Sequence, residues 1–175
     1  ENKLLSMDSS NRYQLYFEEQ TANREKNLIR EKKIIHTLLT RRYKKNGNFN
    51  KAIDHANAIR LMDDRDTRAI QQLKRLYRKT ANYTELINLQ RNQVLKKETI
   101  YTNLGLIKAL HLKYRKEVKD QLLLNESISI CNVFLNEWDL KDSIKSRVID
   151  KLCDTYILKK SYNSAKSTII TFIEE

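Results

Sequence analysis

Residues 43–53 and residues 77–87 of this chain carry nearly the same sequence, YKKNGNFNKAI and then YRKTANYTELI, 34 residues apart. Aligned at this interval, apolar residues meet apolar residues: Leu39 with Leu73, Tyr43 with Tyr77, Phe49 with Tyr83, Ala52 with Leu86 and Ile53 with Ile87. A period of this length is typical of helix pairs that cannot bury an apolar face alone and therefore stack on one another. The repeat thus predicts an array of helix pairs.

The composition supports the same fold class. Two glycines and no proline in 175 residues leave few of the residues that mark hairpins and sharp loops, so we expect an all-α chain. With 40% hydrophobic and 32% charged residues it holds no apolar run long enough to span a membrane. The chain begins at Glu1, which we interpret as a trimmed or processed product. Its cellular location stays open, with the cytoplasm slightly favoured.

Within the first repeat we expect helices over residues 33–45 and 50–62. The apolar stripe of the first comprises Ile35, Leu38, Leu39 and Tyr43, and that of the second comprises Ala52, Ile53, Ala56 and Ile59. Gly47 lies in the turn between them, where glycine can adopt the positive φ that closes a helix. Asp66 is expected to cap the helix that follows.

The rest of the chain divides on the same pattern. Residues 1–32 predict an N-terminal helix, as a truncated or capping unit, and residues 33–66 and 67–100 are two full units. Residues 101–145 predict a longer, degenerate pair, with helices over 102–122 and 126–137 and a loop at Asn125. Residues 146–175 form the last unit, in which the apolar spacing returns at Leu152, Tyr156, Tyr162, Ala165 and Ile169.

These spacings resemble the tetratricopeptide repeat, a helix-turn-helix unit of 34 residues. The resemblance implies a right-handed α-solenoid that serves as a scaffold or adaptor for protein-protein interaction, with the first helix of each unit lining a concave groove. The sequence departs from the family where it usually has a small residue, at Thr40, Lys74 and Cys153, and it lacks the family's proline. A generic helical-repeat solenoid is the alternative.

The basic character is concentrated in the two full units. The net charge is +12, and ten of the excess positive charges lie in residues 33–100. Four pairs of polar or basic residues recur in register: Thr37 with Gln71, Arg41 with Arg75, Lys44 with Arg78, and Lys45 with Lys79. Neighbouring helices pack about 10 Å apart, so these side chains predict a cationic ladder along the groove. Core packing does not require the basic recurrence, which therefore points to a partner.

An acidic protein segment is the partner we expect, because arginine binds carboxylates through two parallel hydrogen bonds. A solvated face without a ligand is the alternative interpretation of the ladder. Some relatives in the resembled family hold a chaperone tail with a Lys/Asn clamp. Here Thr37 and Arg41 occupy the first clamp positions and Gln72 lies near the next, so the clamp is not reproduced.

Two other functions stay open. The same basic stripe could bind RNA or DNA, given a sequence pI near 9.7. Alternatively, the chain could be a structural dimerisation or spacer domain that docks through residues 1–32 or through Thr171, Phe172 and Ile173.

Catalysis and metal binding are not expected. The only glycines, Gly47 and Gly105, cannot make a phosphate loop, and the sequence offers no plausible set of nucleophile, base and orienting group. The run Asp63-Asp64-Arg65-Asp66 lacks the glycine and the final glutamate of a calcium loop, so we interpret it as a loop and cap. His36, His55 and His111 have no zinc spacing, and we expect no cofactor. Cys131 and Cys153 are expected as reduced thiols facing the core.

Overall fold

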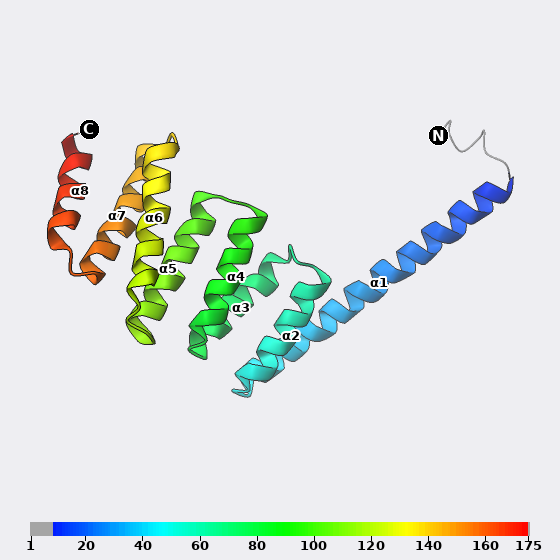
Figure 1. Cartoon of the computed structure of the whole chain (residues 1–175). Coiled ribbons are helices and arrows are strands. Elements are labelled where there is room, and N and C mark those ends of the chain that lie inside the picture. The colour runs from blue at the N-terminus through cyan, green and yellow to red at the C-terminus, as the bar shows by residue number, and fades with distance from the viewer. Residues whose placement is uncertain (1–8, 175) are drawn as a thin grey trace. The chain divides into compact units, whose positions relative to one another are not determined.

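The computed structural model describes residues 9–174, which form eight α-helices and no strand (Figure 1). The helices are α1 (Ser9–Lys45), α2 (Phe49–Met62), α3 (Thr67–Lys79), α4 (Tyr83–Lys96), α5 (Ile100–Lys116), α6 (Gln121–Glu137), α7 (Asp142–Leu158) and α8 (Tyr162–Glu174). The all-α prediction is therefore confirmed. Residues 1–8 of the predicted N-terminal segment and Glu175 lie outside the described residues. The chain forms two compact units, Glu1–Leu76 and Tyr77–Glu175, whose boundary falls within α3.

Three of the turns between helices share one backbone conformation. The second residue after the helix end has a positive φ, 75° at Gly47, 55° at Ala81 and 62° at Lys160. The next backbone N–H then donates to the carbonyl of a tyrosine five residues earlier: Asn48 to Tyr43 (2.9 Å), Asn82 to Tyr77 (2.9 Å) and Ser161 to Tyr156 (2.8 Å). This is the Schellman motif, which satisfies carbonyls that a helix end leaves open. The expected positive φ at Gly47 is confirmed.

In the first unit, α2 turns back along the end of α1 (Figure 1). His36 of α1 and His55 of α2 place their Nδ1 atoms 2.9 Å apart, and the Tyr43 ring stacks on His55 with the centroids 5.4 Å apart. Thr40 lies one turn from both His36 and Tyr43 and is buried. Across the interface, Ala52 is fully buried, and its small side chain allows close approach.

The predicted apolar stripe of the first helix is wrong at two positions. Ile35 is 55% exposed and Leu38 is 57% exposed, whereas Leu39 and Tyr43 are partly buried. The face of α1 that packs on α2 is set by the line of Thr40 and the aromatic pair, so part of this contact consists of polar residues. Apolar spacing alone therefore assigns the wrong face of α1 as the buried one.

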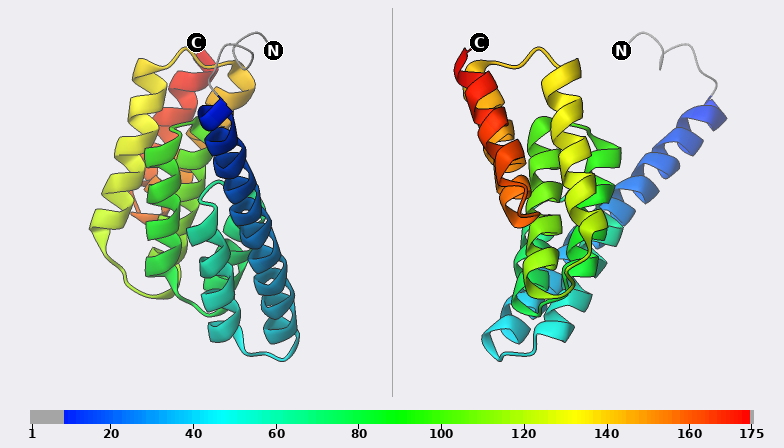
Figure 2. Two further views of the ribbon diagram at one scale, coloured as in Figure 1. Left: turned by 90° about the vertical axis from the view of Figure 1, so that its right-hand side faces the viewer. Right: turned by 60° about the vertical axis from the view of Figure 1, so that its left-hand side comes forward.

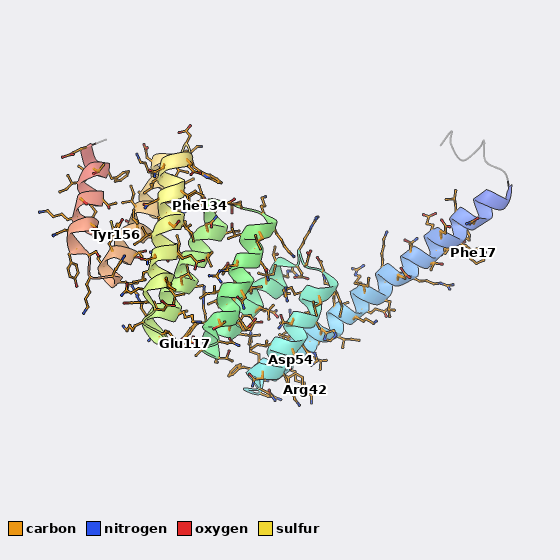
Figure 3. All side chains as sticks on the ribbon, viewed as in Figure 1. Phe17, Arg42, Asp54, Glu117, Phe134 and Tyr156 are labelled. Carbon is orange, nitrogen blue, oxygen red and sulfur yellow. The ribbon has the colours of Figure 1, made fainter. Side chains whose placement is uncertain are left out.

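The two predicted segments that meet at residue 33 form one helix. α1 has 37 residues and α2 has 14, so α2 can cover only the last part of α1. Every residue from Gln14 to Lys32 is exposed, including Phe17 at 70%. Figure 3 shows Phe17 on the part of α1 that continues past α2, and the right-hand view of Figure 2 shows the same extension.

In the second unit the helices pack in chain order from α4 to α8, and α5 also contacts α7. The central cluster is shared by α5, α6 and α7, and comprises Leu104, Ile107, Cys131, Phe134, Val148 and Leu152. A smaller cluster joins α7 to α8 through Ile149, Cys153 and Ala165. Both cysteines are buried free thiols, as expected.

The predicted loop at Asn125 is wrong. Asn125 lies inside α6, and the turn falls at residues 117–120, where Asp120 accepts the N–H of Leu122 at 2.9 Å and caps the helix. Neither glycine nor proline marks this turn, so the apolar run after it looked like a continuation of the first helix. α5 and α6 have 17 residues each, which places the extra length of this pair in its helices. α7 begins at Asp142, ahead of the predicted unit boundary at residue 146.

A buried hydrogen bond ties α5 to α7. The hydroxyl of Thr155 donates its only hydrogen to the Lys151 carbonyl at 2.7 Å, so it accepts from His111 Nε2 at 2.8 Å. His111 therefore carries a proton on Nε2. Burial lowers the pKa of His111 to about 4; the nearby Asp154 carboxylate opposes this shift, and the Lys151 and Arg115 cations add to it.

We expect opposite stability effects at equivalent turn positions. A non-glycine residue at positive φ costs about 1–2 kcal/mol, so Ala81→Gly should raise the free energy of unfolding by about 1 kcal/mol after the entropy of glycine in the unfolded chain is discounted. Gly47→Ala should lower it by a similar amount. A Cβ at Gly47 would meet no atom within 4 Å, so this loss reports backbone strain alone. Urea unfolding followed by circular dichroism measures both changes, and equal signs would refute the shared motif.

His111 makes the stability of the second unit depend on pH. Its folded pKa lies below its ordinary value of 6.5, so between pH 6.5 and about 4 the unfolded chain binds a proton that the folded chain does not. The contribution of the neutral His111 to the free energy of unfolding is therefore fully present above pH 6.5. It is lost as the pH falls toward 4, and the loss is at most about 3 kcal/mol. His111→Gln keeps a donor and cannot titrate. The difference in unfolding free energy between this variant and the parent should shrink from pH 7 to pH 4.5, and a constant difference would contradict the assignment.

Candidate functional site

An open groove of about 530 Å³ runs along one face of α1 in the first unit. Its lining residues are Lys26, Ile29, Arg30, Lys33, Ile34, Thr37, Leu38 and Arg41 of α1, with Arg68 of α3. The α1 residues recur every three or four positions, which places them on one side of the helix. From residue 26 to residue 41 this side spans about 22 Å at 1.5 Å per residue. The groove is thus long and narrow.

The groove is strongly cationic. Five of its nine lining residues are lysine or arginine, and none is acidic. Lys33 is the exception among the cations, because its Nζ lies 2.8 Å from Asp63 Oδ2 and 2.9 Å from Asp66 Oδ2. In the part of the chain that the structure describes, the other four cations have no carboxylate partner. An anionic ligand would therefore meet four charges that the fold itself does not neutralise.

The ion pair at Lys33 holds the loop between α2 and α3 against α1. Hydrogen bonds to Asp63 and then Asp66 raise the pKa of Lys33. The pKa of Asp63 is lowered by Lys33 and by the N–H of Arg65. Burial acts to raise the pKa of Asp66, but the Ala69 N–H and Lys33 together lower it. All three groups are therefore charged near neutral pH.

Asp66 also caps α3, as the sequence predicted, because its Oδ1 accepts the N–H of Ala69 at 2.9 Å. Asp63 closes the loop by accepting the N–H of Arg65 at 3.0 Å. The acidic run is thus a loop and cap, and it contributes two carboxylates that bind Lys33. Because Arg68 lies in the first turn after this cap, the loop places its guanidinium at the groove.

The groove also has an apolar part. Ile29 is 44% exposed, Ile34 is 53% exposed and Leu38 is 57% exposed. These three side chains alternate along α1 with the cations. We call them the aliphatic floor of the groove.

The structure places two of the eight predicted site residues in this groove, Thr37 and Arg41. The Thr37 hydroxyl donates to the Lys33 carbonyl at 2.7 Å, so its oxygen still has acceptor capacity. Arg41 is exposed.

The other six predicted residues are not among those that line the groove. Lys44 and Lys45 are exposed in the last turn of α1, beyond the groove. Gln71 and Arg75 are exposed on α3. Arg75 follows Arg68 by seven residues, so the two project from the same side of that helix. Arg78 and Lys79 form its last turn and belong to the second unit.

Sequence reasoning missed Lys26, Arg30 and Arg68. It looked for basic residues that recur at 34 residues, and the equivalent of Arg68 in the preceding unit is Ile34. Ile34 and Arg68 therefore occupy equivalent repeat positions and line the same groove, but Arg68 supplies charge and Ile34 supplies apolar surface. The spacing of Lys26, Arg30, Lys33 and Arg41 along a single helix was the available signal.

A second cavity, of about 290 Å³, lies in the second unit between α6, α7 and α8, and its lining includes Lys145, Thr168 and Phe172. The Lys145 ammonium lies over the Phe172 ring, 5.8 Å from its centroid. Within residues 9–174 no three metal-ligating side chains come together. Burial raises the pKa of Cys131 to about 12 and raises that of Cys153 as well, so neither is an activated nucleophile.

Comparison with models of known protein families finds no match to the chain, and comparison with curated protein sequences finds none either. Of the helices between residues 9 and 174, none combines the length and the hydropathy of a membrane span.

Proposed function

We propose that this chain is a non-catalytic protein-interaction scaffold whose basic groove on α1 binds an acidic protein segment. The observation that supports this function is the groove itself, in which four lysine and arginine side chains without a described carboxylate partner surround an aliphatic floor. Arginine donates two parallel hydrogen bonds to a carboxylate, and Arg30, Arg41 and Arg68 are three such donors.

Magnitudes indicate that charge alone would bind weakly. An exposed ion pair contributes about 0.2–1 kcal/mol, so four would supply about 1–4 kcal/mol. The loss of translational and rotational freedom on association costs about 4 kcal/mol or more, which offsets this contribution. Burying the exposed half of an aliphatic side chain contributes about 1 kcal/mol of binding free energy. The three floor residues together therefore contribute about as much binding free energy as the four charges. The cations would orient the ligand, and the floor would make the complex stable.

We further propose that the helix pairs stack as a right-handed solenoid similar to tetratricopeptide repeats. Three observations support this: the 34-residue repeat, the Schellman turn shared by Gly47, Ala81 and Lys160, and the chain-order packing of α4 to α8 with its additional contact between α5 and α7.

Nucleic acid is the competing ligand for the same cations. Single-stranded nucleic acids are bound largely by stacking bases on aromatic side chains, and the groove is lined by aliphatic residues instead. This difference favours protein.

Arg41 and Arg42 offer a matched pair of variants for testing the groove. Both are exposed, but only Arg41 lines the groove. The probe is a fluorescein-labelled peptide of glutamate, leucine and alanine, measured by anisotropy. Arg41→Glu should weaken binding at least about tenfold, since it removes one donor and adds a repulsive charge. Arg42→Glu should change it less than about twofold.

Equal losses in the two variants would show general charge attraction and refute the groove. Tighter binding of an oligonucleotide, with an affinity that falls linearly in log salt, would replace the protein ligand with nucleic acid.

Homodimerisation through the other side of α1 is a second candidate function, compatible with the first. Phe17, Leu28 and Ile35 are 70%, 51% and 55% exposed, and their spacings of 11 and 7 residues put them within about 20° around the helix. In an antiparallel pair with its two-fold axis near Lys26, Phe17 of one copy would meet Ile35 of the other. An apolar line of this kind is what a self-complementary interface requires.

Sedimentation velocity over a range of concentrations measures this dimer. Phe17→Gln should raise the dissociation constant at least about tenfold, because it removes an aromatic ring from each end of the interface. Tyr16→Gln is the control, since Tyr16 is 59% exposed but points about 100° away around the helix. A parent chain that stays monomeric throughout the range would exclude the dimer.

A further inference from the structure

We infer that the occupant of the α1 groove is itself an α-helix, with one aliphatic face bordered by carboxylates. This inference rests on the proposed function and specifies its ligand. It excludes an extended acidic tail, which the charges alone would accept equally well.

The backbone of α1 is the first reason. The groove lies along the middle of a continuous helix, where each N–H and C=O is already bonded within the helix. An extended peptide lying there would find no backbone partner and would place its own polar groups against Ile29, Ile34 and Leu38. A helix satisfies its backbone internally and can present side chains alone. Helix-in-groove recognition follows from this requirement.

The pattern of the groove is the second reason. Its α1 residues form two neighbouring rows at intervals of four, one of Lys26, Arg30, Ile34 and Leu38 and the other of Ile29, Lys33, Thr37 and Arg41. Each row holds both cations and apolar residues. Rows at this interval are the ridges between which a partner helix packs, so such a helix would place its apolar face on Ile29, Ile34 and Leu38. The length of about 22 Å accommodates about 15 helical residues. Carboxylates beside that face would then reach the cations on either side, as flanking charges do in coiled coils.

Charge complementarity selects the acidic helix over a basic or neutral one. No lining residue of the groove is acidic, and the carboxylates of Asp63 and Asp66 are bound to Lys33. A basic helix would meet four like charges. The occupant therefore carries aspartate or glutamate on both borders of its apolar face.

Two synthetic peptides of identical composition test the inference on the unmodified chain. Each has about 15 residues of leucine, alanine and glutamate. In one the leucines share a helical face, and in the other their order is scrambled so that no face forms. The segregated peptide should bind at least about tenfold more tightly by anisotropy, and its circular dichroism should show helix gained on binding.

A matched pair of leucines tests the floor. Leu38→Asn should weaken the segregated peptide about fivefold or more and leave a polyglutamate peptide unaffected. Leu95→Asn makes the same chemical change at an exposed residue of α4, 84% against 57%, which lines neither the groove nor the proposed dimer face. It should leave both peptides unaffected. Circular dichroism of each variant confirms that α1 still folds.

The outcomes separate the two proposals. Equal affinity for segregated, scrambled and polyglutamate peptides overturns the helical occupant and leaves acidic binding intact. Failure of every acidic peptide to bind overturns the proposed function together with the inference. Binding of the segregated peptide that Leu38→Asn and Leu95→Asn weaken equally overturns the position of the floor.

Discussion

The groove depends on a difference in length between two neighbouring helices. α1 has 37 residues and α2 has 14, so α2 can bury only the end of its partner. The remainder of α1 stays helical and exposed along Gln14–Lys32, and its side chains divide into two faces. One face carries the groove and the other carries the line of Phe17, Leu28 and Ile35. The mismatch thus leaves uncovered the residues at one end of the groove, Lys26, Ile29 and Arg30, and Phe17 and Leu28 of the proposed dimer face.

Lys33 connects that exposed helix to the rest of the first unit. It lies where the cover of α2 ends, and its ammonium binds carboxylates on both sides of the loop before α3. The same loop begins α3 through the Asp66 cap, so one cation aligns α1, the end of α2 and the start of α3. Its charge is satisfied within the fold, which assigns it a structural role among groove residues whose charges are open to a ligand.

The sequence correctly predicted the structural features that recur with the 34-residue repeat. It did not predict the features that occur in one unit alone. The turn at Gly47, the Asp66 cap, and the buried Ala52, Ala56 and Ile59 follow from local chemistry at a fixed period, and all were found. The orientation of α1 was not, because its contact with α2 uses histidine, threonine and tyrosine in addition to aliphatic residues. The site was found only at Thr37 and Arg41. Arg68 was missed because its equivalent in the preceding repeat is the apolar Ile34. A search for residues that recur at the repeat interval cannot find a site whose equivalent positions hold different residue types.

The electrostatics of helix ends gives the repeated basic residues a structural explanation. Lys44, Lys45, Arg78 and Lys79 lie in the last turns of α1 and α3. Cations there stabilise the negative end of the helix dipole by about 0.3–1 kcal/mol each. Their recurrence thus has a sufficient cause in helix stability, and it no longer indicates a partner by itself.

Arg68 is in the opposite situation. It lies in the first turn of α3, where the same dipole disfavours a cation, so helix stability does not account for it. Arg30 lies well inside α1, where the dipole has little effect in either direction. Arg30 and Arg68 are therefore basic residues for which helix position supplies no reason, and both line the groove. This separation, drawn from helix position and not from sequence repetition, is the physical ground for placing the ligand there.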